Sequence, residues 1–486
     1  MGKRNSITRN IFHLFYSTAL TSGLNAGALI LLAYYLQSHH YGIFSVVMAF
    51  AMIMAYFTDA GLSDIVLREG SKKGVNISVL MSSYVKMRAV LLLLTLAAGF
   101  LLIEWHYSHN QEIIQTGYFL ILPMVTGVAM QSISGAYFQL MEKMQYDGLV
   151  RITSAVGLIA SITTGMLLSL HPFAVCFLYG FSYFLAGILG IYLVTKNIRF
   201  DFKSRFHRGL FDNLGSFTLG GLLFIILPHL GPLILEKTVS LAEIGFFAVA
   251  YRIPQALQQI PFVVAGAYYP VLFRHFNSNQ LSRHLELNIT QVKIMALIGM
   301  GLTIPFFYLS EFFITLLFGE QWLTAAFPLK ILSLMLTFQA INIALADGLT
   351  TRGLQNYRTF IQIIAIISGV FLYFFLSNSY GIMGAAFAGL TIEIITLAGF
   401  WMLTPGRWQV CRKAILPYLL FFLSVLWTFD FIFQAVPFAG ASLHLLLLAT
   451  LLYFDKELNL KLKRLIAESP LAAKWKLKKT QGVENG

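Results

Sequence analysis

Cysteine and charge are both scarce in this sequence, and each shortage excludes a class of protein. The 486 residues include only two cysteines, Cys176 and Cys411, which lack the spacing of a disulfide framework or a zinc site. Charged residues make up 11% of the chain, whereas soluble domains carry about 25%. Hydrophobic residues make up 57%, and the mean hydropathy is +0.73. This composition is typical of a protein embedded in lipid.

Long polar segments and nucleotide-binding motifs are missing as well. No loop between the apolar segments exceeds about 15 residues, so a soluble catalytic domain has no place in the chain. No GxxxxGK[ST] phosphate-binding loop is present, so we do not expect ATP hydrolysis. We expect a protein that is not an enzyme, holds no cofactor or metal, and acts within the membrane.

Apolar segments of membrane-spanning length recur along the whole chain. About 20 predominantly apolar residues cross a bilayer as a helix. The sequence therefore predicts an all-α multi-pass membrane protein with about fourteen transmembrane helices. The predicted helices cover residues 10–36, 41–67, 79–103, 112–140, 149–170, 173–195, 210–236, 243–273, 285–316, 325–350, 357–377, 381–403, 414–430 and 438–454.

Lysine and arginine lie on alternate sides of these predicted helices. If both termini are cytoplasmic, the cytoplasmic segments and helix ends hold 28 of the 34 basic residues, and the external segments hold one, Lys237. Such an imbalance follows the positive-inside rule. The basic runs at 196–208 and 461–479 are thus topology signals, which could also bind anionic lipid. The net charge of +13 therefore does not indicate a nucleic-acid partner.

Two parts of the chain repeat one another. "YGIFSVVMAF" (41–50) aligns with "IGFFAVAYRI" (244–253), 203 residues later, and "RNIFHLFYSTALTSG" (9–23) aligns with "RGLFDNLGSFTLGGL" (208–222). Six helices per copy is an even number, so both copies have the same orientation, with an axis along the membrane normal and a cavity between them. The predicted divisions are an N-terminal six-helix lobe (1–200), a C-terminal six-helix lobe (201–409), helices 13 and 14 (410–455) and a basic cytoplasmic tail (456–486).

The first helix of each copy carries small or helix-breaking residues. Interrupted helices at matching positions of two repeats indicate a transport site. Close packing through small residues explains the same pattern equally well. The residues are Ser22, Gly23 and Gly27 in one copy, and Gly220, Gly221, Pro228, Gly231 and Pro232 in the other.

Several longer stretches resemble a known family. "LLAYYLQSHHYGIFSVVMAF" with "TDAGLSDIVLREG" (31–70), "EIGFFAVAYRIPQAL" (243–257) and "LFGEQWLTAAFPLKILSL" (317–334) are similar to polysaccharide-export flippases. These belong to the multidrug/oligosaccharidyl-lipid/polysaccharide superfamily, and the similarity extends from residue 9 to about 403. The resemblance implies two lobes that rock around a central cavity in a bacterial cytoplasmic (inner) membrane. It also implies an undecaprenyl-pyrophosphate-linked oligosaccharide, moved from the inner to the outer leaflet. The expected partners are that substrate, membrane lipids, and a polysaccharide polymerase with its export machinery.

Arg252 is the leading candidate for binding the pyrophosphate. It lies in an apolar helix about 12 Å below the expected outer surface, where a charge costs about 2.5–3.5 kcal/mol. Arginine suits pyrophosphate because its planar fork donates two parallel hydrogen bonds and stays protonated. The alternative is an arginine paired with a neighbouring carboxylate.

Three further cations are candidates for substrate binding. Lys86 and Arg88 lie 8 to 10 residues into a predicted helix, where they could form an inward-facing site or extend to the membrane surface. Arg68 ends the second helix, where the positive-inside rule also accounts for it. It matches an arginine usual in the family.

Two carboxylates are candidates for coupling transport to protons or sodium. Glu393 lies about 12 residues into the twelfth helix, near the expected bilayer midplane. It could bind and release a proton, or neutralise a buried cation. Asp59 lies near the cytoplasmic end of the second helix, where a structural capping role is the alternative.

Two other functions have to be weighed against a flippase. A multidrug/cation antiporter of the same fold would favour a cavity rich in carboxylates, whereas the deep charges here are mainly cationic. A membrane-embedded glycan polymerase would need a catalytic loop or domain, and the short loops argue against it. The sequence therefore favours a flippase.

Overall fold

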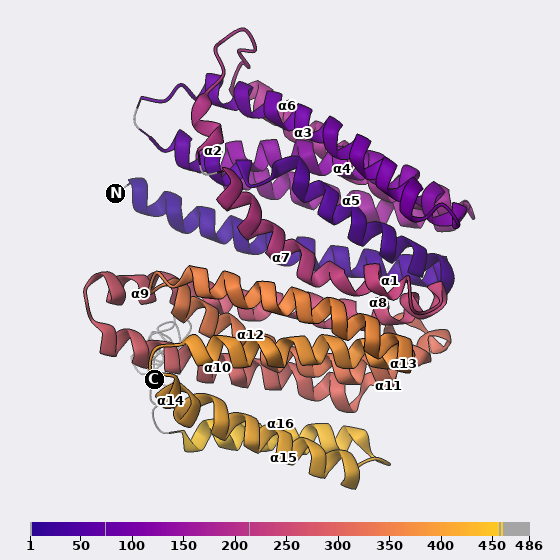
Figure 1. The fold of residues 1–486 in the computed structure, drawn as a ribbon, viewed down its shortest axis with the longest axis vertical. Coiled ribbons are helices and arrows are strands. Elements are labelled where there is room, and N and C mark those ends of the chain that lie inside the picture. The colour runs from indigo at the N-terminus through magenta and orange to yellow at the C-terminus, as the bar shows by residue number, and fades with distance from the viewer. Residues whose placement is uncertain (1, 73, 213, 456–457, 460–486) are drawn as a thin grey trace, which may run out of the picture. The chain divides into compact units, whose positions relative to one another are not determined.

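The computed structural model describes residues 2–72, 74–212, 214–455, 458 and 459. They form helices joined by turns and loops (Figure 1), and no strand occurs among them. Predicted helices 13 and 14 correspond to the last two helices, and the basic run at 461–479 lies outside the described residues. The α-helices are α1 (Gly2–Asp59), α2 (Leu62–Gly70), α3 (Ile77–His106), α4 (Gln111–Leu140), α5 (Met144–Leu167), α6 (Pro172–Asn197), α7 (Leu214–Leu235), α8 (Leu241–Leu257), α9 (Gln259–Asn277), α10 (Leu281–Tyr308), α11 (Ser310–Phe318), α12 (Ala326–Thr350), α13 (Gln355–Leu403), α14 (Arg407–Val410), α15 (Leu416–Ile432) and α16 (Pro437–Phe454).

Two of these helices are bent so that each contains two membrane spans. α1 is interrupted at Gln37 (φ 58°), whose side-chain amide donates to the Tyr34 carbonyl oxygen at 2.9 Å. α13 is interrupted at Gly381 (φ 57°), where glycine tolerates the left-handed backbone. Within the described ranges, eleven continuous stretches are long and apolar enough to cross a membrane, these two among them, and α7 adds a shorter apolar helix. The predicted all-α fold with about fourteen spans is confirmed.

The helix ends differ from the prediction where the backbone turns. The second span ends at Asp59 instead of 67, because Ala60 and Gly61 both have positive φ before α2 begins. The segment 243–273 is divided at Gln258 into α8 and α9. Pro261 lacks the amide hydrogen that would continue the helix across this point. These turns shorten helices without changing their order.

The chain divides into two compact units. The first comprises residues 1–256, 311–332 and 356–396, which include α1 to α8, α11 and most of α13. In this unit α7 packs along α1. The Tyr56 hydroxyl donates to the Thr218 carbonyl oxygen at 2.6 Å. The Thr218 hydroxyl donates to the Ala60 carbonyl oxygen at 2.8 Å. α1 and α7 therefore lie side by side in the first unit. In the same unit α4 and α6 approach closely, because Gly127 lies directly against the Tyr183 backbone.

The second unit comprises residues 257–310, 333–355 and 397–486, which include α9, α10, most of α12 and α14 to α16. Lys293 of α10 lies 2.7 Å from a carboxylate oxygen of Asp455, which follows α16. The Tyr418 hydroxyl of α15 donates to the same carboxylate at 2.7 Å. These contacts attach the hairpin of α15 and α16 to α10.

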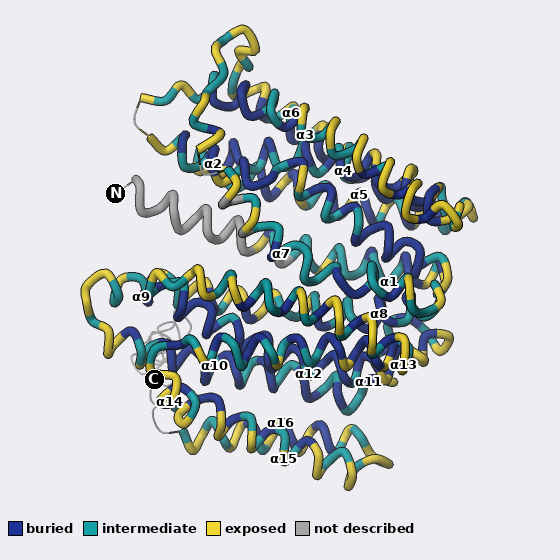
Figure 2. The backbone as a smooth tube through the Cα atoms, viewed as in Figure 1, coloured by how far each residue is buried: buried dark blue, intermediate teal, exposed yellow. Residues whose placement is uncertain are grey.

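Large apolar side chains are exposed on several helices. Trp105 at the end of α3 is 77% exposed, and Trp427 and Phe431 of α15 are 78% and 86% exposed. Figure 2 shows exposed residues along α15 and α16 and toward the ends of α3 and α6. Exposed apolar surface on this scale is expected where helices face lipid.

Candidate functional site

Arg252 in α8 is held by a neutral partner. Its guanidinium donates from Nη1 to Oε1 of Gln255 at 2.9 Å. Gln255 lies about one turn further along the same helix. Among the described residues, no carboxylate oxygen lies within 4 Å of this guanidinium. Gln255 fixes the side chain while leaving its positive charge uncompensated at that distance, so Arg252 remains able to bind an anion.

Arg252 faces a small cavity within the first unit. The cavity has a volume of about 20 Å³, which is room for about one water molecule. Three helices supply its walls. α7 continues unbroken through Pro228 and Pro232, so the interruption expected from the sequence does not occur in this helix, but both prolines line the cavity. The lining consists of Ser45 and Ala49 of α1, Pro228, His229 and Pro232 of α7, and Ala248, Tyr251, Arg252 and Gln255 of α8.

Polar aromatic side chains surround this arginine. Tyr41, Tyr179, Tyr183 and His229 all lie close enough to interact electrostatically with the Arg252 charge. The Tyr41 side chain is fully buried and lies beside the guanidinium. Hydroxyl and imidazole groups can donate hydrogen bonds to oxygen atoms of a bound headgroup.

The cavity lies where equivalent positions of the two repeats meet. In the alignment of 41–50 with 244–253, Ser45 corresponds to Ala248 and Ala49 corresponds to Arg252. All four residues line the cavity. One copy therefore supplies the cation, and the other supplies a small side chain that leaves space for it.

A second pair of equivalent positions closes the structure near this cavity. A β-carbon at Gly42 would overlap the Leu241 carbonyl oxygen, and one at Gly245 would overlap the Ser38 carbonyl oxygen. The same offset of 203 residues relates Gly42 to Gly245 and Ser38 to Leu241. The two contacts are thus equivalent, and the absence of side chains at both glycines allows the backbones to touch. We name these four residues the glycine contact.

An aromatic cluster covers the glycine contact. The Trp322 ring packs edge-on against Tyr41 at 5.8 Å and against Phe246 at 5.6 Å between ring centroids. Trp322 is only 1% exposed. Tyr41 precedes Gly42 and Phe246 follows Gly245 in the sequence, and Trp322 packs against both of these rings. The end of the cavity that is predicted to be external is therefore tightly packed.

Glu393 of α13 lies near the same site. Tyr251 interacts electrostatically with both Arg252 and Glu393, and Tyr373 interacts with Glu393 as well. The structure therefore places two of the candidates predicted from the sequence around one tyrosine. The coupling role of Glu393 stays a prediction.

Arg88 and Asp59 form a buried ion pair. Arg88 is 1% exposed, and Nη1 contacts the Asp59 carboxylate. It also donates to the Tyr84 hydroxyl and, from Nη2, to the Thr58 hydroxyl, both at 3.1 Å. Breaking a buried pair by removing one member costs about 3–5 kcal/mol. These contacts give both residues a structural role in joining α1 to α3, and their predicted roles in binding and coupling stay untested.

The two remaining candidates lie outside the Arg252 cavity. Arg68 lies 3.0 Å from the Glu69 carboxylate and donates to the Asp212 carbonyl oxygen at 3.1 Å, which ties α2 to the segment before α7. Lys86 is half-buried on α3. Neither belongs to the lining of the cavity.

Several lining residues were not among the candidates predicted from the sequence. His229 lies between the two prolines of α7 that the sequence had indicated as a transport-site signal, so a polar residue between these prolines was a usable clue. Gln255 and Tyr251 carried no such signal, because a neutral partner one turn away has no distinctive spacing.

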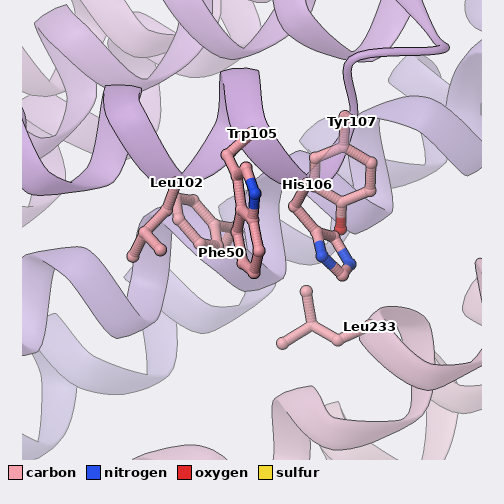
Figure 3. Close-up of a pocket in the computed structure, with 6 residues that line it drawn as sticks. All are labelled: Phe50, Leu102, Trp105, His106, Tyr107 and Leu233. Carbon is pink, nitrogen blue, oxygen red and sulfur yellow. The ribbon is translucent and has the colours of Figure 1, made fainter.

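A second, apolar pocket lies beside the first cavity in the same unit. It has a volume of about 260 Å³ and lies between α1, α3 and α7. Figure 3 shows the rings of Trp105, His106 and Tyr107 extending from the end of α3 toward Leu233 of α7. Phe50 and Leu102 complete the lining.

Comparison with known proteins places this geometry in a family. A sequence model described as "Polysaccharide biosynthesis protein" matches residues 7–276, which is more than half of the chain. The chain belongs to the polysaccharide biosynthesis protein family. The family resemblance inferred from the sequence is thereby confirmed.

One relative of this polysaccharide biosynthesis protein takes part in teichuronic acid biosynthesis, according to its name. The teichuronic acid biosynthesis protein TuaB of Bacillus subtilis (strain 168) is 28% identical over 132 residues. The match covers 26% of this chain and 27% of that relative, so the chain matches about a quarter of the relative's length.

Solved structures of membrane transporters share the fold of this polysaccharide biosynthesis protein. The lipid II flippase MurJ in an inward closed conformation has a TM-score of 0.67 and 14% identity, covering 92% of this chain and 99% of that chain. An inward-facing multidrug resistance MATE family transporter of the MOP superfamily has a TM-score of 0.68 and 11% identity, covering 80% and 95%. At these identities the likeness shows the fold alone. The protein is a multi-pass membrane protein with the fold of this superfamily.

Proposed function

We propose that this protein is a flippase for undecaprenyl-pyrophosphate-linked oligosaccharides. The observation that carries the proposal is the Arg252 guanidinium, held by the neutral Gln255 and facing a cavity between equivalent helices of two repeats. Membership of the polysaccharide biosynthesis protein family and the fold shared with a lipid II flippase support a transporter of this kind.

The cavity supplies the groups that such a headgroup requires. A pyrophosphate binds best to a planar, permanently charged donor that can form two parallel hydrogen bonds. Arg252 provides that donor, and His229 and Tyr251 line the same cavity. Sugars need further hydrogen bonds and water, which a larger opening of this cavity would admit. The isoprenoid chain would stay outside this cavity.

Transport requires this cavity to change size. At about 20 Å³ it holds about one water molecule and excludes an oligosaccharide. The glycine contact closes its predicted external end. In our proposal the cavity opens first toward the inner leaflet and then, when the glycine contact separates, toward the outer leaflet of a bacterial cytoplasmic membrane.

Energy for outward transport has two proposed sources. Moving negative charge outward across an inside-negative membrane gains about 2.3 kcal/mol per charge per 100 mV. Glu393, which lies near Tyr251 and thus near Arg252, is proposed to add coupling to protons or sodium. A polymerase and export machinery would then use the oligosaccharide on the external side.

A multidrug antiporter of the same fold is the main competing proposal. A cationic cargo would be repelled by the Arg252 charge, since none of the other residues that line the cavity is a carboxylate. The lining therefore favours an anionic headgroup over a cation.

Export by variants of Arg252 tests the proposal. Arg252→Ala should fold normally but lower export of lipid-linked oligosaccharide by about tenfold to a hundredfold, because charge-assisted hydrogen bonds contribute about 1.5–3 kcal/mol each. Arg252→Lys keeps the charge without the fork, so its rate should be intermediate. Arg283→Ala, which removes an exposed arginine at the start of α10 that donates to the neutral Gln280, is the matched control. Export is measured in proteoliposomes with a defined lipid-linked oligosaccharide.

A double variant separates binding from charge compensation. If Arg252 only neutralised Glu393, single variants would express poorly, and Arg252→Ala combined with Glu393→Gln would restore both folding and export. The binding proposal forbids restored export. A well-folded and active double variant would refute it.

A further inference from the structure

The apolar pocket and the Arg252 cavity are lined by the same pair of helices. On α1, Ala49 lines the Arg252 cavity and the next residue, Phe50, lines the apolar pocket. On α7, Pro232 lines the cavity and Leu233 lines the pocket. Successive residues of a helix point about 100° apart. The two spaces therefore lie on neighbouring faces of the packed α1 and α7.

The pocket lies at the end of a helix that exposes apolar side chains. Leu102 is 50% exposed and Trp105 77% exposed, while Leu101 and Leu94 on the same stretch of α3 are 70% and 61% exposed. Tryptophan at the end of a span is typical of the membrane surface. The pocket thus continues into an apolar strip along α3 that is suited to a lipid chain.

The charged residues beside the pocket do not favour a ligand of either charge. The Lys237 ammonium lies 5.6 Å from the centre of the Tyr107 ring, which lines the pocket. Lys237 also lies 3.2 Å from the Glu236 carboxylate. Because a cation and an anion lie side by side here, they are poorly suited to hold the anionic headgroup of a phospholipid, and the apolar lining is the feature that a ligand would recognise.

From these observations we infer that the pocket binds a segment of the isoprenoid chain of the transported lipid while its headgroup is at Arg252. The inference rests on the proposed function. At about 260 Å³ the pocket is smaller than the 300–1,000 Å³ or so of sites that enclose a whole ligand. It therefore holds one segment, and the rest of the chain lies along α3. The rings of Trp105, Tyr107 and Phe50 pack against the branched methyl groups of that segment.

Chain-length dependence of export tests the inference. Leu233→Trp fills the pocket without touching Arg252. Two substrates carry the same oligosaccharide diphosphate, one on an undecaprenyl chain and one on a geranyl chain too short to reach the pocket and strip together. Wild-type protein should export the long-chain substrate faster, and Leu233→Trp should lower that rate by about tenfold, the effect of losing a few buried methylene groups. The rate for the short-chain substrate should stay unchanged.

A matched variant and a direct label complete the test. Leu167→Trp introduces the same side chain at an 80% exposed leucine at the end of α5 and should leave both rates unchanged. A photoreactive undecaprenyl chain should label peptides containing Leu102 and Trp105 in wild type and not in Leu233→Trp. This labelling needs no transport, so it decides the inference even if the proposed function is wrong.

Three results would overturn the inference. Equal slowing of both substrates by Leu233→Trp would mean a general structural defect. Unchanged export of the long-chain substrate with unchanged labelling would mean that the pocket is not used. Loss of the label on adding phosphatidylglycerol, but not undecaprenyl phosphate, would assign the pocket to an ordinary membrane phospholipid.

Discussion

Arg252 and Arg88 are both deep arginines of the first unit, and the charge of their partners separates them. Arg88 contacts the carboxylate of Asp59, so its charge is compensated within the protein. Arg252 donates to the amide oxygen of Gln255, which orients the guanidinium and leaves its charge for a ligand. Arg252 is partly buried, and a guanidinium withdrawn from water without a carboxylate beside it lowers the stability of the fold. At the scale of the residue, Gln255 is therefore the partner that makes Arg252 useful.

We expect Gln255→Glu to inactivate export while preserving the fold. The carboxylate would have nearly the same shape and would form an ion pair with Arg252, which a pyrophosphate would have to displace. Export in proteoliposomes should fall by about tenfold or more, the equivalent of one charge-assisted hydrogen bond. Gln255→Met, which removes the acceptor but adds no charge, should have a smaller effect. Wild-type export by Gln255→Glu would contradict the role assigned to the neutral partner.

At the scale of the element, the start of α8 and the second half of α1 meet through backbone atoms. The glycine contact brings each glycine against a carbonyl group of the other helix. Helices that touch in this way can separate without breaking interlocked side chains. The contact therefore suits a closure that has to open in every transport cycle.

Valine at either glycine should hold this closure open. We expect Gly42→Val and Gly245→Val to have similar effects, because their contacts are equivalent: export falls, and a cysteine introduced at Ser45 reacts with an impermeant thiol reagent added outside. The reactions are compared in protein lacking Cys176 and Cys411. Gly266→Val is the matched control, since a β-carbon at Gly266 has no atom within 4 Å. Unchanged reactivity of the Ser45→Cys protein in both valine variants would exclude an external gate here.

The hairpin of α15 and α16 is attached by a group that titrates outside the membrane spans. Burial would raise the pKa of Asp455, but the hydrogen bonds from Lys293, the Leu458 amide and Tyr418 outweigh burial and hold it below its ordinary value of 3.8. A carboxyl group whose pKa is lower in the folded state stabilises the fold above its unfolded pKa and loses that effect as the pH falls through the folded value.

Asp455→Asn should therefore lower thermal stability by a constant amount between pH 5 and 8. The difference in melting temperature between wild type and variant should shrink only below about pH 4, where Asp455 takes up a proton first in the unfolded chain and, at lower pH, in the folded protein. Thermal unfolding in detergent across this pH range measures it. A difference that already disappears between pH 7 and 5 would show that another group controls the attachment of the hairpin.

At the scale of the whole molecule, the proposed direction of transport depends on the orientation of the chain. Reporter fusions after residues 105 and 320 should be external, and fusions after 203 and 475 cytoplasmic, because the basic residues follow the positive-inside rule. Alkaline phosphatase and green fluorescent protein activities report the two sides. A cytoplasmic reporter at 320 would contradict the two-repeat arrangement. The glycine contact would then have to be assigned to the cytoplasmic side of the membrane.

The sequence predicted features that depend on local composition and missed those that depend on partners. The fourteen spans follow from apolar length. Arg252 was found because a charge is costly in lipid, and Pro228 and Pro232 because proline removes a helical hydrogen bond. The pairing of Arg88 with Asp59 joins residues on different helices, which no local pattern encodes. The break at Gln37 was missed too, since glutamine seldom adopts a left-handed backbone.

Ala49 and Arg252 occupy equivalent positions of the two copies and both line the cavity, and this difference between the copies has an evolutionary consequence. In a dimer of identical halves every position at the two-fold axis occurs twice, so an arginine there would face its own copy. Two unpaired guanidinium groups in one small space would repel each other strongly in a medium of low dielectric constant. Once the halves were joined in one gene, position 252 could become arginine while position 49 stayed alanine. The glycine pair, in contrast, works only if both copies keep it, so descendants of this fusion should preserve the glycines together and vary the cation alone.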